Sequence, residues 1–355
     1  MKQDDMTRDL LTEHLGRYPQ LNIQDIFKFL YQSAFGCEHL VSSLDRVTDG
    51  IKREYADLCR ADGRPLVERL DGEYSRVHLC WLDKGLKAGT LAKLFSLSAK
   101  KEPEGLERLL KKLDTVRELV KEGGLPFSAD EFEAALAKWQ DNGFEAVRHS
   151  DGFREAYRPA YRVIANRFVP FLPLFAELDR RLDEGEVLLA VEGGSASGKT
   201  TLGGLLEQIY GCALIHMDDF FLRPEQRCPE RFAQVGGNVD RERFLAEVLL
   251  PLSRGEAVRF RPFDCSTMTL ADAVQVPQRR LTVVEGAYSM HPELAEFYDL
   301  SVYLDLSDGL QRERILHRNS PQTAQMFFEK WIPLERVYFS ETKIKERCDM
   351  VIEIE

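Results

Sequence analysis

Residues 186–201 read Glu-Val-Leu-Leu-Ala-Val-Glu-Gly-Gly-Ser-Ala-Ser-Gly-Lys-Thr-Thr, and this stretch decides the fold. The apolar run at 187–191 is continuous and is followed by glycines, which is typical of a strand buried on both faces of a parallel sheet. Residues 193–200 then fit the pattern G-x-x-x-x-G-K-[ST] without a mismatch, and leucines continue after it at helical spacing. The stretch therefore predicts a strand, a phosphate-binding loop and a helix.

The residue types of this loop explain why it would bind a nucleotide. Glycines allow backbone N–H groups to turn inward around phosphate oxygens, and the N-terminus of the following helix adds positive potential. Lys199 is expected to reach the β- and γ-phosphates of ATP, and the Thr200 hydroxyl is expected to ligate Mg²⁺. The predicted ATP-binding residues are Gly193, Gly194, Ser195, Ala196, Ser197, Gly198, Lys199, Thr200 and Thr201.

Further short apolar runs follow the loop, and helical stretches lie between several of them. The helical stretches are 243–252 and 309–317, and the apolar runs are 213–217, 281–284, 301–306 and 350–354. Strands that alternate with helices predict a parallel sheet. The predicted fold class is therefore α/β, a P-loop NTPase parallel sheet of the nucleoside and nucleotide kinase type.

The chain before residue 185 has a different, helical periodicity. One apolar face is predicted from Leu106, Leu109, Leu110, Leu113, Val116, Leu119 and Val120, which lie three and four residues apart. Asn22 and Ser128 are expected to cap two other helices. No segment there alternates as a long strand. With the polar junction at 183–185, this predicts a mainly α-helical domain over 1–183 and a P-loop kinase domain over 184–355.

Composition narrows the class of protein. The 355 residues carry a formal net charge of −11, which disfavours nucleic acid and anionic membrane surfaces as partners. The polar N-terminus predicts no secretory signal, and no apolar run is long enough to predict a transmembrane helix. Seven widely spaced cysteines without a CxxC pair predict reduced thiols. We therefore expect a cytoplasmic protein, and a homo-oligomer remains open.

Acidic residues follow two of the predicted strands. Asp218 comes after the run at 213–217, and Glu285 directly follows the run at 281–284. Because the carboxyl ends of parallel strands line the ligand crevice, both are expected beside the phosphates. Asp218 could accept a proton from a substrate hydroxyl, and Glu285 could hold Mg²⁺ through water.

Several motifs together resemble those of a known family. The loop GGSASGKTT resembles the P-loop of uridine kinases, and MDDFF at 217–221 resembles the matching segment of nucleoside kinases, including nicotinamide riboside kinases. The resemblance continues at 238–244, 261–264 and 283–286 and spans about 186–355. It implies a five-stranded sheet with a mobile lid, ATP and Mg²⁺ as cofactors, and phosphorylation of a primary hydroxyl. It also implies that Asp218 is the catalytic base and that Asp240 holds ribose hydroxyls.

The resemblance implies an acceptor pocket and a lid. The predicted substrate-binding residues are Asp218, Phe221, Asp240, Phe263 and Asp264. Where uridine kinases carry two tyrosines and a histidine, this chain has Phe221, Phe263 and Met268, so pyrimidine recognition is weakened. Arg314 and Arg318 lie four residues apart on one predicted helix face before the loop at 319–322. With Asp218 and Lys199, these arginines complete the predicted catalytic set, as clamps for the γ-phosphate.

Three functions remain open from the sequence. The first is an ATP-dependent kinase of the uridine kinase type that acts on a nucleoside or related small metabolite. The second is a kinase of a non-nucleoside sugar or a vitamin riboside, favoured by the apolar replacements. The third is a non-catalytic ATP-dependent switch with the helical domain as effector. A GTPase is disfavoured because the chain has no N-K-x-D tetrapeptide.

The helical half carries four of the seven histidines, and several of them have polar residues nearby in the sequence. They are His14, His39, His78 and His149. If they converge, they could form a second anion or metal site, but their spacing defines no ligand set. We interpret them as structural polar groups with satisfied hydrogen bonds. This half loosely resembles a helical domain found beside such kinases in bacteria, and that resemblance implies no activity.

Overall fold

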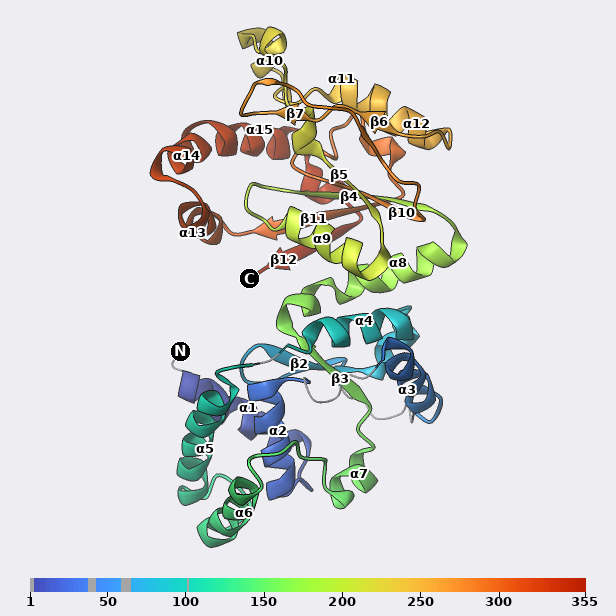
Figure 1. Cartoon of the computed structure of the whole chain (residues 1–355). Helices are drawn as coiled ribbons and strands as arrows, with labels where there is room; N and C mark the ends of the chain where they lie inside the picture. The colour runs from blue at the N-terminus through green and yellow to red at the C-terminus, as the bar shows by residue number, and fades with distance from the viewer. Residues whose placement is uncertain (1–2, 38–42, 59–64, 101) are drawn as a thin grey trace. The chain divides into compact units, whose positions relative to one another are not determined.

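A computed structural model describes residues 3–37, 43–58, 65–100 and 102–355 of the chain. His39 therefore lies outside the described residues. The chain divides into two compact units, Met1–Asp179 and Arg180–Glu355 (Figure 1). Each unit has its own buried core.

The second unit is built on a five-stranded parallel sheet. Its strands are β4 (Val187–Gly193), β5 (Ala213–His216), β10 (Leu281–Glu285), β11 (Leu300–Leu306) and β12 (Met350–Ile354). Their order across the sheet is β12-β11-β4-β10-β5. All five predicted apolar runs are strands within one or two residues of the expected bounds. The predicted α/β P-loop fold is confirmed.

The strand register determines which residues meet at the carboxyl edge of the sheet. Glu285, at the end of β10, is paired with Val191 of β4 on one side and with His216 of β5 on the other. Because all strands run in the same direction, the loops after β4, β5 and β10 leave the sheet at the same edge. The phosphate-binding loop, Asp218 and Glu285 therefore emerge together.

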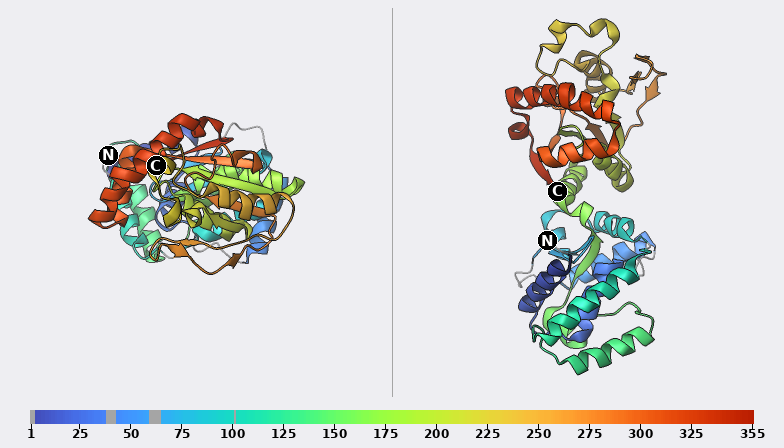
Figure 2. Two further views of the ribbon diagram at one scale, coloured as in Figure 1. Left: turned by 90° about the horizontal axis from the view of Figure 1, so that it is seen from above. Right: turned by 90° about the vertical axis from the view of Figure 1, so that its left-hand side faces the viewer.

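Helices follow β4 along the chain of this unit. They are α9 (Lys199–Tyr210), α10 (Pro229–Phe232), α11 (Arg241–Phe244), α12 (Leu250–Ser253), α13 (Asp308–Arg318), α14 (Pro321–Met326), α15 (Ile332–Thr342) and α16 (Ile344–Arg347). Two π-helical turns, 245–249 and 327–331, join α11 to α12 and α14 to α15. The red segment α13–α15 faces the viewer in the right-hand view of Figure 2. Two small antiparallel strand pairs complete the unit. One is the hairpin of β7 (Phe263–Asp264) and β8 (Thr269–Leu270), and the other joins β6 (Arg259–Phe260) to β9 (Val274–Gln275).

The first unit is mainly helical, as predicted. Its helices are α1 (Gln3–Arg17), α2 (Ile23–Phe35), α3 (Leu44–Ala56), α4 (Ala88–Ser98), α5 (Gly105–Lys121), α6 (Ala129–Asp141) and α7 (Asp151–Tyr157). Helix α8 (Leu172–Glu184) runs across the division between the units. The predicted caps are confirmed, since Asn22 and Ser128 each form a capping box at the start of α2 and α6.

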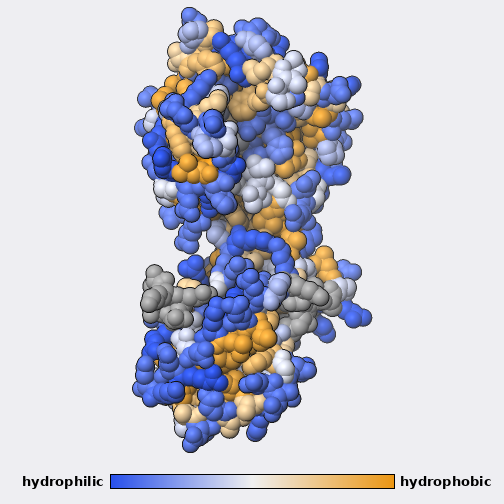
Figure 3. Space-filling view, turned by 60° about the vertical axis from the view of Figure 1, so that its left-hand side comes forward, coloured by the Kyte–Doolittle hydropathy of each residue, from blue (hydrophilic) through white to orange (hydrophobic). Residues whose placement is uncertain are grey.

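Two features of the first unit differ from the sequence predictions. A three-stranded antiparallel sheet is present, in the order β1 (Val67–Arg69), β2 (Tyr74–His78), β3 (Tyr161–Ala165). In addition, the predicted apolar face of α5 is only partly buried, because Leu106 and Leu110 are about half exposed. Figure 3 shows apolar side chains reaching the surface of both units among hydrophilic ones.

Among the residues described, no helix combines the length and the apolar character that crossing a membrane requires.

Candidate active site

The loop between β4 and α9 has the backbone conformation of an anion cradle. Gly193 has φ of 149° and Gly198 has φ of 99°, and a Cβ atom at Gly193 would lie 2.8 Å from the Leu304 carbonyl oxygen. Ala196 has φ of 65°, so the loop alternates in handedness as backbone N–H nests do. Gly198 is the N-cap of α9, which places the helix N-terminus at the loop.

Lys199 lies in the loop as the motif predicts. Its Nζ donates hydrogen bonds to the carbonyl oxygens of Gly193 and Gly194, both at 2.9 Å. The Ser197 hydroxyl is buried and has no hydrogen-bond partner. The loop thus holds a positive charge and an unused hydroxyl group where phosphate oxygens would bind.

Thr200 and Glu285 meet at the start of α9. The Thr200 hydroxyl donates to Glu285 Oε1 at 3.0 Å, and Glu285 is buried at the end of β10. His216 Nδ1 lies 2.6 Å from the same oxygen, and this hydrogen bond raises the pKa of His216 above its ordinary value. A hydroxyl and a carboxylate oxygen in contact form a donor set that suits Mg²⁺. The predicted metal residues are therefore adjacent.

Asp218 lies just beyond the end of β5, in a short 3₁₀ turn at 217–220. Desolvation raises the pKa of its carboxyl; the positive charge of Lys199 opposes this shift, and the negative charge of Glu285 adds to it. His216 and Arg318 also act on Asp218 electrostatically. Lys199, Glu285 and Arg318, which belong to separate sequence motifs, thus all act electrostatically on this carboxylate.

Residues that the sequence motifs did not reveal hold the loop from the side of α13 and α15. The Ser195 backbone N–H and hydroxyl donate to the Glu335 carboxylate of α15, at 2.9 and 2.5 Å. Gln311 of α13 donates from Nε2 to the Ser195 carbonyl at 2.8 Å. Burial raises the pKa of Glu335, while Lys199 and the bonds from Ser195 lower it. Nothing in the local sequence around Glu335 marks this role.

A second buried carboxylate lies beneath the loop. Glu192 of β4 has no exposed surface and accepts hydrogen bonds from the backbone N–H groups of Gly193 (2.8 Å), Tyr288 (3.2 Å) and Met290 (3.1 Å). The Tyr338 hydroxyl of α15 also donates to it, at 3.1 Å. Burial raises the pKa of Glu192 to about 7. Glu192 ties β4, the segment after β10 and α15 together.

The predicted acceptor residues fall into two groups. Asp240 is buried and caps α11 through Oδ1, while its Oδ2 is buried with no hydrogen-bond partner. Arg223 and Arg243 approach Oδ2 at 3.7 and 3.6 Å. Phe221 forms an isolated β-bridge with Val239, directly before Asp240. These residues therefore lie together next to the turn that carries Asp218.

Phe263 and Asp264 lie on the β7–β8 hairpin, which packs against the turn that carries Asp218. Phe263 is buried, and the Arg227 guanidinium lies over its ring at 5.5 Å. The Asp264 carboxylate instead accepts from the backbone and hydroxyl of Ser266, at 2.7 and 2.6 Å. Phe263 thus lies near the site, while Asp264 is engaged in the hairpin turn.

The two predicted lid arginines have different surroundings. Arg314 donates to the carbonyl oxygens of Ala196 (3.4 Å) and Glu355 (3.1 Å), so it contacts the phosphate-binding loop itself. Arg318 ends α13, lies over the Phe327 ring at 5.6 Å and acts on Asp218 electrostatically. Arg314 therefore touches the loop, and the charge of Arg318 is among those that act on the predicted base.

The strand order, the glycine-rich loop and the helix that follows it define a P-loop α/β fold. No family model matches the chain. The uridine kinase of Limosilactobacillus reuteri (strain DSM 20016) is 28% identical over 144 residues, which are 38% of this chain. The match covers 65% of that relative, somewhat less than two thirds of its length. The predicted resemblance to uridine kinases is confirmed in sequence over this part of the chain.

Two solved structures are similar to about half of the chain. One is described as a possible uridine kinase from Bacillus stearothermophilus, with 23% identity, 50% of this chain and 99% of that chain covered, and a TM-score of 0.37. The other is a putative fructose transport system kinase from Silicibacter sp. TM1040, with 21% identity, 47% and 89% coverage, and a TM-score of 0.36.

Proposed function

We propose that the protein is an ATP- and Mg²⁺-dependent kinase that transfers the γ-phosphoryl group of ATP to a primary hydroxyl of a nucleoside or related small metabolite. The observation that carries this proposal is the meeting of four groups at one sheet edge: Lys199 in the loop, the Thr200–Glu285 pair, and Asp218. The sequence similarity to uridine kinases supports the same reading.

The proposed transfer assigns a role to each group. The acceptor hydroxyl oxygen attacks the γ-phosphorus, the bond to the β,γ-bridging oxygen breaks, and ADP leaves. Asp218 orients the hydroxyl and takes its proton. Lys199 and the loop N–H groups hold the phosphates, and Arg318 stabilises charge on the transferring group. Thr200 and Glu285 would hold Mg²⁺, which would neutralise part of the phosphate charge.

The predicted substrate-binding residues favour recognition of a sugar hydroxyl over recognition of a polar base. Asp240 Oδ2 is a buried acceptor without a hydrogen-bond partner, which a ribose hydroxyl would satisfy. Phe221 and Phe263 are aromatic where a uracil-binding site would present polar groups. A vitamin riboside or another sugar is therefore the second candidate acceptor.

An acceptor screen tests this function. Purified full-length chain is mixed with ATP, Mg²⁺ and a panel of nucleosides, ribosides and free sugars, ADP release is followed, and the product is identified by mass spectrometry. We expect one class of acceptor to gain 80 Da, the mass of a phosphoryl group in place of a hydrogen. ATP binding without any phosphorylated product would instead support the switch hypothesis.

A further inference from the structure

One arginine beside the predicted substrate-binding residues has no role in the proposed phosphoryl transfer. Arg227 follows a short 3₁₀ turn at 224–226, and its Nε donates to the Leu222 carbonyl oxygen at 2.8 Å. Its guanidinium lies over the Phe263 ring, 5.5 Å from the ring centroid. Phe263 belongs to the hairpin that packs against the turn of Asp218. Arg227 is therefore held in place next to residues that the proposed function assigns to the acceptor.

The guanidinium of Arg227 is unpaired and accessible. Within the part of the chain that the structure describes, it has no carboxylate partner, and its Nη1 and Nη2 have no hydrogen-bond partner. Arg227 is partly exposed, and neither Nη atom is enclosed by protein. Three other arginines of this region are paired, namely Arg223 with Glu225 at 3.3 Å, Arg231 with Glu242 at 2.6 Å and Arg243 with Glu247 at 3.3 Å. Arg227 thus keeps two nitrogens available for a ligand.

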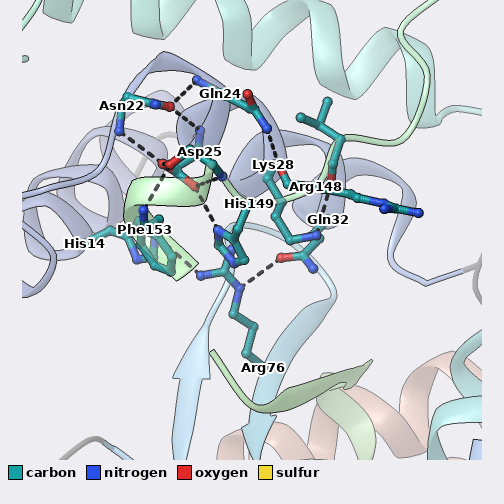
Figure 4. Close-up of polar contacts among 12 residues, drawn as sticks. His14, Asn22, Gln24, Asp25, Lys28, Gln32, Arg76, Arg148, His149 and Phe153 are labelled. Carbon is teal, nitrogen blue, oxygen red and sulfur yellow. Dashed lines mark hydrogen bonds and ion pairs between the residues drawn. The ribbon is translucent and has the colours of Figure 1, made fainter. Parts of the chain in front are cut away.

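Accessibility distinguishes Arg227 from Arg76 of the first unit, which also has an unpaired guanidinium nitrogen. Arg76 is only 2% exposed, its Nη2 is enclosed, and its Nε donates to Gln32 at 2.9 Å. Figure 4 shows Arg76 among the polar side chains of this unit, which include His14 and His149. Both histidines are hydrogen-bonded, as the sequence indicated. That buried group is structural, whereas the Arg227 guanidinium reaches solvent.

The carboxylates in the neighbourhood of Arg227 are engaged elsewhere. Desolvation raises the pKa of Cys265, which lies on the same hairpin as Phe263, and the positive charge of Arg227 opposes this shift. The negative charges of Asp218 and Asp264 also act on this thiol. Asp264 accepts two hydrogen bonds within its own turn, and the charges of lysine, histidine and arginine side chains oppose that of Asp218. Neither carboxylate pairs with Arg227.

The side chains around Arg227 indicate which chemical group it would bind. Where uridine kinases carry two tyrosines and a histidine, this chain has Phe221, Phe263 and Met268, none of which offers a strong hydrogen-bond donor. Arg227 instead presents a guanidinium at the face of one of these rings. The planar fork of a guanidinium matches the oxygens of a carboxylate or phosphate and binds them more strongly than a neutral carbonyl.

We propose that the acceptor carries an anionic group, a carboxylate or a phosphate, besides the hydroxyl that is phosphorylated, and that Arg227 binds this group through Nη1 and Nη2. This inference rests on the proposed kinase function and names the class of its substrate. Asp240 would contact sugar hydroxyls, while Arg227 would select for negative charge. Arg227 takes no part in the transfer of the proton or of the phosphoryl group.

Acceptors matched in all but charge test the proposal. The full-length chain, ATP and Mg²⁺ are assayed with orotidine against uridine, which differ by one carboxylate, and with ribose 1-phosphate against methyl ribofuranoside. All four carry a primary hydroxyl. We expect kcat/KM to be about tenfold or more higher for the anionic member of at least one pair, and that pair identifies the anion. Phosphorylation of the neutral members with equal or higher kcat/KM would overturn the proposal and leave the kinase function intact.

Two arginine variants locate the selection for charge. Arg227→Gln removes the guanidinium, and we expect the ratio of kcat/KM between the anionic and the neutral acceptor to fall about tenfold or more, mainly through a higher KM for the anion. Arg259→Gln removes the same charge at an exposed position of β6 and should keep this ratio within about twofold. Equal changes in both variants would contradict binding by Arg227.

A measurement on the unmodified chain separates failure of this proposal from failure of the kinase function, and it needs no variant to fold. Phenylglyoxal modifies accessible guanidinium groups, and peptide mass analysis gives the rate at each arginine. ADP and Mg²⁺ are present in excess to keep ribose 1-phosphate out of the phosphate-binding loop. Saturating orotidine or ribose 1-phosphate should slow the modification of Arg227 by about threefold or more, whereas uridine and methyl ribofuranoside should not. Arg259 should react at an unchanged rate.

The two readouts together decide both questions. Protection of Arg227 without any phosphorylated product would support the anion site and count against the kinase function. Absence of protection by either anion would refute the anion site, whether or not the chain phosphorylates an acceptor.

Discussion

At the scale of single residues, Asp218 is the group on which the proposed chemistry depends most. Replacing it by Asn removes the proton acceptor and keeps the size of the side chain. We expect Asp218→Asn to lower the rate of phosphoryl transfer by roughly 10²–10⁴-fold. ATP affinity should change little, because Lys199 and the loop N–H groups remain. Steady-state rates and ATP titration measure the two effects separately.

The neighbouring Asp219 provides a matched control. It is next in sequence, and desolvation raises its pKa as well. Asp219→Asn should retain transfer activity within about an order of magnitude, since the proposed chemistry assigns it no proton.

Because the pKa of Asp218 is raised, the acid limb of the pH profile of kcat/KM should have its midpoint above pH 3.8, the ordinary pKa of aspartate. Full activity of Asp218→Asn would remove this residue as the base.

Gly193 is the residue at which backbone geometry and function coincide. Gly193→Ala would force a Cβ to 2.8 Å from the Leu304 carbonyl and 2.9 Å from Ser197 Oγ, at a φ of 149° that only glycine adopts readily. We expect a loss of about 1–3 kcal/mol in stability and a loss of ATP binding. Chemical denaturation and nucleotide titration measure these changes.

Gly204 in α9 is the control for that substitution. A Cβ there meets nothing within 4 Å. Gly204→Ala should therefore leave ATP binding intact and raise stability by about 0.5–1 kcal/mol through the helix propensity of alanine. Equal effects of the two substitutions would show that the loop conformation at Gly193 is not the cause.

At the scale of elements, α15 holds the phosphate-binding loop through Glu335. Two like unit charges 4 Å apart repel each other by about 4 kcal/mol at an effective dielectric constant of 20. A buried carboxylate in contact with the loop therefore opposes the binding of a triphosphate. Glu335→Gln removes this charge and one of the two hydrogen bonds with Ser195. We expect severalfold tighter ATP binding and a stability loss of about 1 kcal/mol.

The exposed Glu341, on the same helix, separates this local effect from a change in net charge. Glu341→Gln should alter neither ATP affinity nor stability by more than about 0.5 kcal/mol. Weaker ATP binding by Glu335→Gln would mean that the hydrogen bonds preorganise the loop for nucleotide, and would contradict the expected electrostatic effect.

Elements also show how far the sequence predicts this fold. The five strands of the parallel sheet are continuous apolar runs because both sheet faces are covered, so composition alone marks them. The sequence does not predict the sheet of the first unit, because its strands lack such an apolar run. All five residues of β2 are buried, including Arg76 and His78, so neither an apolar run nor an alternating pattern appears.

The same distinction applies to the candidate site. Lys199, Thr200, Glu285 and Asp218 were predictable because each belongs to a motif or ends a strand. Glu335 and Gln311 were not, because they reach the loop from helices more than 100 positions later, with no local pattern around them. Contacts of this kind depend on tertiary packing, which a motif does not encode.

At the scale of the whole molecule, the two units should respond to pH in opposite directions. In the second unit, burial raises the pKa of Glu192 from its ordinary 4.5 to about 7. Between these values the native state binds more protons than the unfolded state, so stability is greatest at low pH and falls as pH rises through 7. In the first unit, burial lowers the pKa of His149 from 6.5 to about 4. There the unfolded state binds more protons, so stability falls as pH decreases below 6.5.

Lowering the pH from about 7 to about 5 should therefore stabilise the second unit and destabilise the first, each by about 2 kcal/mol from these two groups. His216, whose pKa is raised, adds to the gain, and His291, whose pKa is lowered, reduces it. The chain is unfolded in urea at each pH, given a hydrogen-exchange pulse at a common pH, and analysed by peptide mass. The peptides of each unit then report the urea midpoint of that unit separately. Glu192→Gln should abolish the gain of the second unit, whereas Glu186→Gln, at an exposed neighbouring position, should preserve it. Midpoints that move in the same direction in the unmodified chain would contradict these assignments, because the two buried groups exchange protons with opposite sign.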